Sequence, residues 1–329
     1  MPKISKSTLL RALAAAEAGR PAYPGVARVP PLNSPKLAGT RRATAAALRP
    51  VLVKAGFGDK QFVELRKQHN AELERVAAQD QALALRRSAK IRKTLRAGLA
   101  NKLRAYGTLA NLPAAPFLTI IDRPFLIWAR PRSNIIWDSH IGTGDSWAKV
   151  KAVAETGDKI WGTDTLSFYF IWDNPTPYYA VIDAATFITF NGYARAYAEG
   201  SFWGGIDPSY SHYSYLSMWT GLTLWQWSDN PPTPSGTPSQ SILSLSAQAG
   251  FFDDTQTSAV SGSSDHSYTH YVVNPSGTIV FEVSLAMSYS VYGGHTLSDF
   301  SDGSYEVSCP YMVVGLLSAP PMGGLMATS

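Results

Sequence analysis

The sequence contains one cysteine, Cys309, so it excludes both an internal disulfide and a cysteine-based zinc site. It has no uninterrupted apolar run of 18 residues, so we expect no membrane span. The short apolar stretch of residues 9–16 is interrupted by Arg11 and bounded by Glu17, and no credible cleavage site for a secretory signal follows it. These absences favour a cytoplasmic location, although the composition of residues 1–58 also suits a transit peptide.

Acidic residues are scarce in the first third of the chain. Residues 1–106 hold 22 of the 29 Lys and Arg but only 6 of the 24 Asp and Glu, which gives this part a net charge of +16. Residues 107–329 carry −11, so the overall charge of +5 is an average of two unlike parts. The division predicts separate structural units with opposite electrostatic properties.

The first unit, residues 1–58, contains ten basic residues and one acid. Prolines recur from Pro21 to Pro50, too often for a helix or a central strand. We interpret this region as a flexible, basic N-terminal arm that contains one short helix.

Residues 59–106 contain no proline and one glycine, Gly98, among many strong helix formers. Asp59 is suited to the N-cap and Gly107 to the position after the last helical residue. The pattern predicts a single basic helix, roughly 70 Å long if unbroken.

The apolar residues of this helix form one stripe in its second half, where they recur every four residues: Ile91, Leu95, Leu99 and Leu103. A helix that buries one face needs such a stripe. Four further residues extend the stripe less regularly: Leu65, Leu73, Val76 and Leu83. The pattern therefore neither establishes nor excludes a coiled coil. The helix must pack either on the following domain or on copies of itself.

From residue 107 onward the apolar pattern changes to a period of two. Residues 279–291 predict a long strand with one buried side, and residues 305–313 repeat the alternation after an Asp302-Gly303 turn. Many further short strand patterns are separated by Gly, Pro, Asn and Asp, with hardly any helical pattern between them. We therefore predict that residues 107–329 form one antiparallel, jelly-roll-like β-sandwich, with a flexible tail from Pro320.

Catalytic signatures are absent. Asp138-Ser139-His140 has the residue types of a catalytic triad, but adjacent positions on a strand point in alternating directions. His266 and His270 would lie roughly 13 Å apart on a surface strand, too far to share one metal ion. We expect a non-enzymatic protein without a metal or cofactor.

A basic cluster in the second half of the helix is the main candidate for binding an anion or a partner: Arg86, Arg87, Lys90, Arg92, Lys93 and Arg96. No acid follows Asp80 within the helix, and like charges three and four residues apart repel one another. Nucleic acid or the acidic β-domain of a neighbouring copy could relieve this repulsion, and a solvated face also stays open.

Aromatic residues gather in the β-domain, which holds all nine Trp and 14 of the 16 Tyr. Tyr193 and Tyr197 share one strand face, as do Trp225 and Trp227. We interpret these pairs as core or interface residues in preference to a sugar-stacking row.

The arm, helix and sandwich together predict a structural protein that self-assembles into a homo-oligomer, particle or filament. Two alternatives stay open. One is a capsid-like protein that packages nucleic acid with its basic N-terminal region, and the other is a carbohydrate- or surface-binding module.

Overall fold

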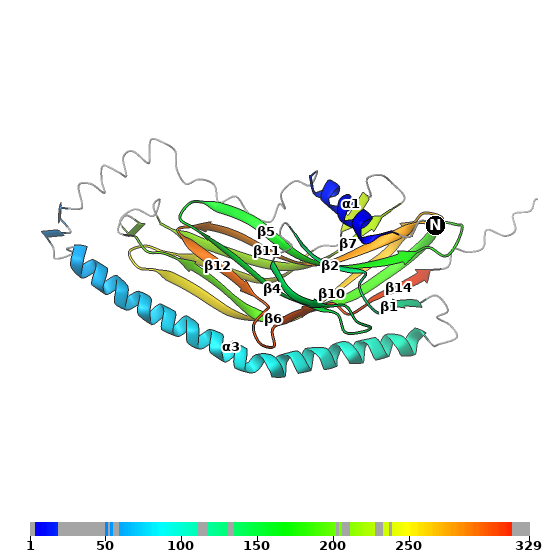
Figure 1. The fold of residues 1–329 in the computed structure, drawn as a ribbon, viewed down its shortest axis with the longest axis horizontal. Coiled ribbons are helices and arrows are strands. Elements are labelled where there is room, and N and C mark those ends of the chain that lie inside the picture. The colour runs from blue at the N-terminus through cyan, green and yellow to red at the C-terminus, as the bar shows by residue number, and fades with distance from the viewer. Residues whose placement is uncertain are drawn as a thin grey trace, which may run out of the picture.

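A computed structural model describes residues 4–18, 50–51, 53–54, 59–110, 118–130, 135–201, 204–205, 211–227, 233–236 and 239–317. The described residues form two antiparallel sheets packed face to face, with one helix on the outer side of each sheet (Figure 1). The prediction of a mainly β sandwich preceded by a long basic helix is confirmed.

Sheet A has eight strands: β1 (Leu118–Ile121), β3 (Ile136–His140), β4 (Trp147–Thr156), β6 (Ala180–Ala198), β10 (Asp254–Val273), β12 (Gly294–Asp299), β13 (Glu306–Ser308) and β14 (Met312–Leu317). Sheet B has six strands: β2 (Leu126–Arg130), β5 (Ile160–Asp173), β7 (Tyr213–Gln226), β8 (Thr233–Gly236), β9 (Gln240–Gln248) and β11 (Thr278–Tyr292). The long strand β6 organises sheet A, because it pairs with β10 on one side and with β12, β13 and β14 on the other.

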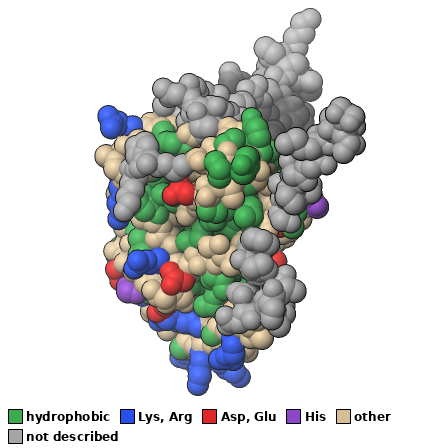
Figure 2. Space-filling view, turned by 90° about the vertical axis from the view of Figure 1, so that its right-hand side faces the viewer, with side chains coloured by type: hydrophobic (Ala, Val, Ile, Leu, Met, Phe, Trp, Pro, Cys, Tyr) green, Lys and Arg blue, Asp and Glu red, His purple; other side chains and the backbone are tan. Residues whose placement is uncertain are grey.

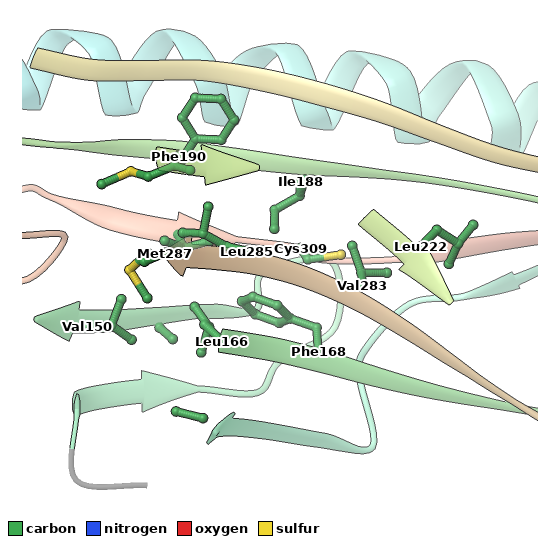
Figure 3. Packing of buried hydrophobic residues seen from close by; sticks show 14 of the residues in the cluster. Val150, Leu166, Phe168, Ile188, Phe190, Leu222, Val283, Leu285, Met287 and Cys309 are labelled. Carbon is green, nitrogen blue, oxygen red and sulfur yellow. The ribbon is translucent and has the colours of Figure 1, made fainter. Parts of the chain in front are cut away.

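The core lies between the two sheets and consists of alternate residues from facing strands (Figure 3). Val283 and Leu285 of β11 and Phe168 of β5 point inward from sheet B, and Ile188 and Phe190 of β6 meet them from sheet A. Their alternation follows the period of two that the sequence shows for residues 279–291. The opposite side of β11 is also largely covered, since Val280 and Glu282 are buried, so the prediction of only one buried side was wrong for this strand.

The predicted strand of residues 305–313 is divided into β13 and β14. Pro310 lies in the gap and has no N–H with which to continue a ladder. The turn before it is confirmed, because Gly303 has a φ of +52° and the Tyr305 N–H donates to the Asp302 carbonyl at 2.8 Å. His266 of β10 is buried rather than on the surface, which corrects the expectation for this residue.

The long helix, α3 (Asp59–Ala110), begins at the predicted N-cap and continues four residues beyond its predicted last residue, Tyr106. Gly107 is part of the helix instead of ending it, and the Thr108 hydroxyl donates to the Arg104 carbonyl at 3.0 Å. The helix is bent and follows the outer face of sheet A (Figure 1). It packs against β6, β10 and β1 of its own chain, so the alternative of docking on the following domain describes this structure.

A short helix, α1 (Lys6–Ala18), forms within the region assigned to the basic arm. Ser5 caps it, because the Ser5 hydroxyl accepts a hydrogen bond from the Thr8 N–H at 3.1 Å. Most of the remaining residues 19–58 and the tail from Pro320 lie outside the described residues. Within the described chain, neither helix is long and apolar enough to cross a membrane.

Candidate functional site: the two faces of the long helix

The contact between α3 and the outer face of sheet A, here called the seam, is held together largely by charged side chains. Its centre is Glu306 of β13, whose side chain is 5% exposed. Arg96 donates to both Glu306 oxygens, from Nε to Oε1 at 2.8 Å and from Nη2 to Oε2 at 3.1 Å. Arg92 Nε lies 2.8 Å from Oε2 in an ion pair. Two members of the predicted basic cluster therefore neutralise one buried acid of the same chain.

Further ion pairs lie along the seam on both sides of Glu306. Lys102 Nζ donates to Asp265 Oδ1 at 2.9 Å, and it lies 3.6 Å from the centroid of the Phe187 ring. Arg66 Nη2 donates to Glu199 at 2.6 Å, near the N-terminal end of α3. We call Arg92, Arg96 and Lys102 the inner row. Their acidic partners belong to the same chain, whereas the alternatives from the sequence were nucleic acid, the β-domain of a neighbouring copy and a solvated face.

One seam contact has the charges reversed. Glu74 of α3 accepts from Arg195 of β6, and Arg195 Nη1 lies 3.0 Å from Glu74 Oε2. The hydrogen bond from Arg195 lowers the pKa of Glu74. His295 of β12 lies in the same region, and burial lowers the pKa of its imidazole below 6.5, with a further contribution from Arg195. These side chains border a cavity of about 310 Å³ between α3 and sheet A.

Apolar contacts close the C-terminal half of the seam. Leu99 is buried against Phe187 and Tyr311, and Leu103 and Tyr106 pack around them. Ile91 and Leu95 are half-buried, so the predicted stripe faces the β-domain.

The N-terminal half of the seam differs from the prediction, because three apolar residues point away from sheet A: Leu65, Val76 and Leu83, with exposures of 51%, 40% and 45%. The seam instead takes every eleventh residue, namely Arg66, Ala77, Ser88 and Leu99. An 11-residue period corresponds to 3.67 residues per turn, close to that of a straight helix. Small and polar residues let the helix approach the sheet, and the Ser88 carbonyl accepts from Asn191 Nδ2 at 3.1 Å.

The remaining cations of the second half of α3 point to solvent. We call them the outer row: Arg86, Arg87, Lys90, Lys93 and Arg104. In the part of the chain that the structure describes, none of the five forms an ion pair with an acid, and Arg104 donates to the Asn101 side chain at 3.1 Å. Figure 2 shows Lys and Arg side chains gathered at the lower end of the molecule, where α3 runs in Figure 1.

The predicted aromatic pairs lie on opposite sheets and do not form one surface. Tyr193 is buried under α3, where its hydroxyl donates to the Ala77 carbonyl at 3.2 Å, and burial raises its pKa. Tyr197 donates to Asp253, and burial raises the pKa of Tyr197 as well. Trp225 is fully buried on the outer side of sheet B, and Trp227 packs beside it. Both pairs are thus packing residues within the chain.

Beneath α1, Trp225 contributes to a buried polar cluster. Its Nε1 donates to Glu282 Oε2 at 2.9 Å, and Glu282 also accepts from Arg130 and from the Ser167 hydroxyl at 2.9 Å. The Tyr169 hydroxyl completes the cluster by donating to Glu282 Oε1 at 3.3 Å. Because the carboxylate is paired and hydrogen-bonded, its burial is compensated.

α1 covers this cluster with an apolar contact. Leu9 is fully buried against Tyr169, Trp225 and Val280, with Ile4 packed beside it. Lys6 Nζ lies 6.0 Å from the centroid of the Phe125 ring. Burying one leucine contributes about 1.5–3 kcal/mol, so Leu9 is the main anchor of α1.

Asp138, Ser139 and His140 are exposed on β3 and do not converge on one another. The Asp138 carboxylate accepts from the Ser139 backbone N–H at 2.9 Å, and the His140 ring lies 6.0 Å from that of Trp147. Among the described residues, no three His, Cys, Asp or Glu side chains form a group that could hold a metal ion.

Sequence reasoning did not identify the acids of the seam, because Glu306, Asp265 and Asp253 are far apart in the chain. Their only signal was the net charge of −11. The cavity at Glu74 and His295 had no signal, since its lining comes from α3, β4, β6 and β12.

No protein-family model and no curated protein matches the chain. Among solved structures, it is similar to one described as "CBM4 structure and function", with 12% identity, a TM-score of 0.14, and coverage of 56% of this chain and 85% of that chain. It is also similar to a solved structure of infectious bursal disease virus, Gx strain, with 10% identity and a TM-score of 0.13. That match covers 54% of this chain and 42% of the other. Such values carry no argument about function.

Proposed function

We propose that this chain is a non-enzymatic structural protein that self-assembles by exchanging its N-terminal helix between copies. The observation that carries the proposal is the placement of α1. It is anchored on sheet B through Leu9, whereas the next long element, α3, lies on the opposite sheet.

The length of chain between the two helices makes the exchange feasible. Residues 19–58 separate α1 from α3, and 40 residues can span at most about 130–145 Å. The sheet B site of a neighbouring copy is therefore within reach. A 13-residue helix is marginal in isolation, so α1 depends on such a site. Every copy that gives up its own helix accepts another, and the exchange preserves all contacts.

The test compares two Leu→Asp substitutions in the full chain, after nuclease treatment and a high-salt wash. Light scattering on a size-exclusion column measures the mass over a range of protein concentrations. We expect the parent chain to exceed its monomer mass of 35.6 kDa and Leu9→Asp to run as a monomer. Leu83→Asp, at an exposed position of α3, should behave like the parent. A parent chain that stays monomeric contradicts self-assembly, and an oligomeric Leu9→Asp variant contradicts the exchange.

The outer face of sheet B favours a second candidate function, the binding of a neutral polysaccharide surface. Trp161 of β5 and Tyr215 of β7 are 67% and 44% exposed, and both are in register with Ser290 of β11 between them. Two strand spacings place the two strands about 10 Å apart. Exposed hydroxyls of Ser244 and Ser246 follow on β9. Aromatic rings next to uncharged hydroxyls suit a sugar ring better than an ion.

Retention on columns of cellulose and chitin tests this candidate. Trp161→Ala should reduce retention by roughly tenfold or more, since a stacked ring contributes about 1.4 kcal/mol or more. Trp137→Ala is the matched control, because Trp137 is 69% exposed on sheet A. If neither column retains the parent chain, or if both variants behave alike, the candidate is wrong.

A further inference from the structure

The cations in the second half of α3 lie on two opposite sides of the helix, one facing sheet A and the other facing solvent. From Gln81 to Ala110 the helix contains eight Lys and Arg and no acid. The three cations of the inner row meet Glu306, Asp145 and Asp265 in the seam. The five cations of the outer row are exposed on the opposite side. Repulsion between them is relieved when an external anion approaches.

The outer row follows the helix axis, and all five of its side chains are exposed among the described residues. At a rise of 1.5 Å per residue, Arg86 and Arg104 lie about 27 Å apart along the helix axis. The residues between the cations on this face are small, with Ala89, Ala97 and Ala100 all exposed. Long basic side chains that rise above alanines can reach a flat or convex anionic surface without steric hindrance.

From these observations we infer that the outer row of α3 is a docking surface for the phosphate backbone of nucleic acid. Duplex DNA carries one negative charge per roughly 1.7 Å of its axis, so a row of about 27 Å runs beside about eight base pairs. Lys and Arg at this density gain affinity by releasing condensed counterions, and they need no base contacts. The inference is independent of the exchange of α1.

The acidic β-domain of another copy fits the outer row less well. The acids of sheet A that face a helix already bind α3 of their own chain, as Glu306, Asp265 and Asp253 do. A second copy would thus present a sheet that its own α3 covers. An anionic membrane also fits less well, because a helix that lies in a membrane needs large apolar residues along the whole length of its cations. Two exposed leucines, Leu83 and Leu85, precede Arg86, but the exposed residues between Arg86 and Arg104 are small or polar.

The test measures the anisotropy of a fluorescein-labelled DNA duplex of about 20 base pairs with the full chain, at NaCl concentrations from about 50 to 400 mM. One variant removes four cations of the outer row: Arg86→Gln, Arg87→Gln, Lys90→Gln and Lys93→Gln. Glutamine keeps a similar helix propensity, and these exposed positions make no seam contact. All variants are full chains, so the ten basic residues in the first 58 positions contribute equally to each and cancel when affinities are compared.

The matched control removes the same charge from four exposed cations elsewhere: Lys60→Gln, Lys67→Gln, Arg123→Gln and Lys159→Gln. Each phosphate contact contributes about 0.9 to the slope of log K against log salt. We expect the slope of the outer-row variant to be shallower by about 3–4 and its affinity at about 100 mM salt to fall by tenfold or more. The control should keep the parent slope to within about one contact.

Four outcomes would overturn the inference. The first is a parent chain that does not bind the duplex. The second is an equal loss in the control and outer-row variants, which would assign binding to net charge alone. The third is a stronger outer-row-dependent binding to phosphatidylserine vesicles than to the duplex, which would assign the surface to membranes. The fourth is an oligomer that forms without nucleic acid and dissociates in the outer-row variant, which would assign the surface to a second copy.

Discussion

The inner and outer rows of α3 consist of the same residue types on the same helix, yet their surroundings differ. Arg92 and Arg96 meet a nearly buried carboxylate, whereas Arg86 and Lys90 meet solvent. A desolvated charge needs its partner, and an exposed one contributes little to folding. The comparison teaches that a cluster of cations in a sequence can divide into residues that stabilise the fold and residues that remain available to an anion.

The largest expected effect comes from removing equal charge from the two rows. Arg92→Gln with Arg96→Gln leaves Glu306 buried without a cation and should lower the free energy of unfolding by about 3 kcal/mol. For a domain of this size, the melting temperature should fall by roughly 6–12 °C. Arg86→Gln with Lys90→Gln should change the free energy by less than about 0.5 kcal/mol. Thermal unfolding followed by circular dichroism measures both, and equal shifts would break the comparison.

The apolar residues of α3 extend the comparison. Leu99→Ala opens space against Phe187 and Tyr311 and should cost about 2–3 kcal/mol. Leu83→Ala, on an exposed side of the helix, should cost less than about 0.5 kcal/mol. Urea unfolding followed by tryptophan fluorescence measures the difference. A costly Leu83→Ala would show that a further contact covers this side of the helix.

The hydroxyl of Tyr193 tests whether α3 docks directly on sheet A. Tyr193→Phe removes the hydrogen bond to the Ala77 carbonyl and leaves that carbonyl buried, so it should cost about 1 kcal/mol. Tyr215→Phe is the control, because this ring is 44% exposed on the other sheet and its change should be close to zero. The same urea titration applies, and a neutral Tyr193→Phe would contradict direct docking of α3 at this point.

The smallest effect is a pH dependence of the seam. Burial lowers the pKa of His295 below 6.5 in the folded chain, so the unfolded chain binds the proton more readily. Stability should therefore fall as the pH decreases from about 7 to 5. His295→Gln should reduce this loss. Arg195 lowers the pKa of Glu74, so Glu74 adds a further loss of stability only when the pH falls below 4.5, the ordinary pKa of a glutamate. Melting temperatures across this pH range provide the measurement, and an unchanged slope in His295→Gln would contradict the assignment.

The sequence predicts those parts of the structure that depend on local pattern. The boundary near residue 107 and the start of α3 at Asp59 follow from helix propensity and periodicity, and the alternation of residues 279–291 follows from strand geometry. Pro310, which divides the expected strand of residues 305–313, was a local signal that could have been used.

The partner of the basic cluster could not be predicted, because Glu306 lies 210 positions from Arg96 in the chain and only the fold brings them together. The seam also depends on small and polar residues such as Ala77 and Ser88, which an apolar-stripe criterion ignores. For the same reason Leu65 and Val76 were assigned to the wrong side of the helix. Charge counts made the acidic β-domain one of three candidate surroundings for the cluster, and only the tertiary contacts identify the acids that bind it.

The central claim is that the two rows have different roles, and one measurement tests it most directly: the melting temperature of three full chains with and without excess DNA duplex. A ligand at 100 times its Kd stabilises the folded state by about 2.7 kcal/mol. The account predicts that the Arg92→Gln, Arg96→Gln chain melts lower than the parent but gains the same increase from the duplex. The fourfold outer-row chain should melt like the parent and lose most of that increase. A lost increase in the inner-row chain, or a full increase in the outer-row chain, would contradict the account.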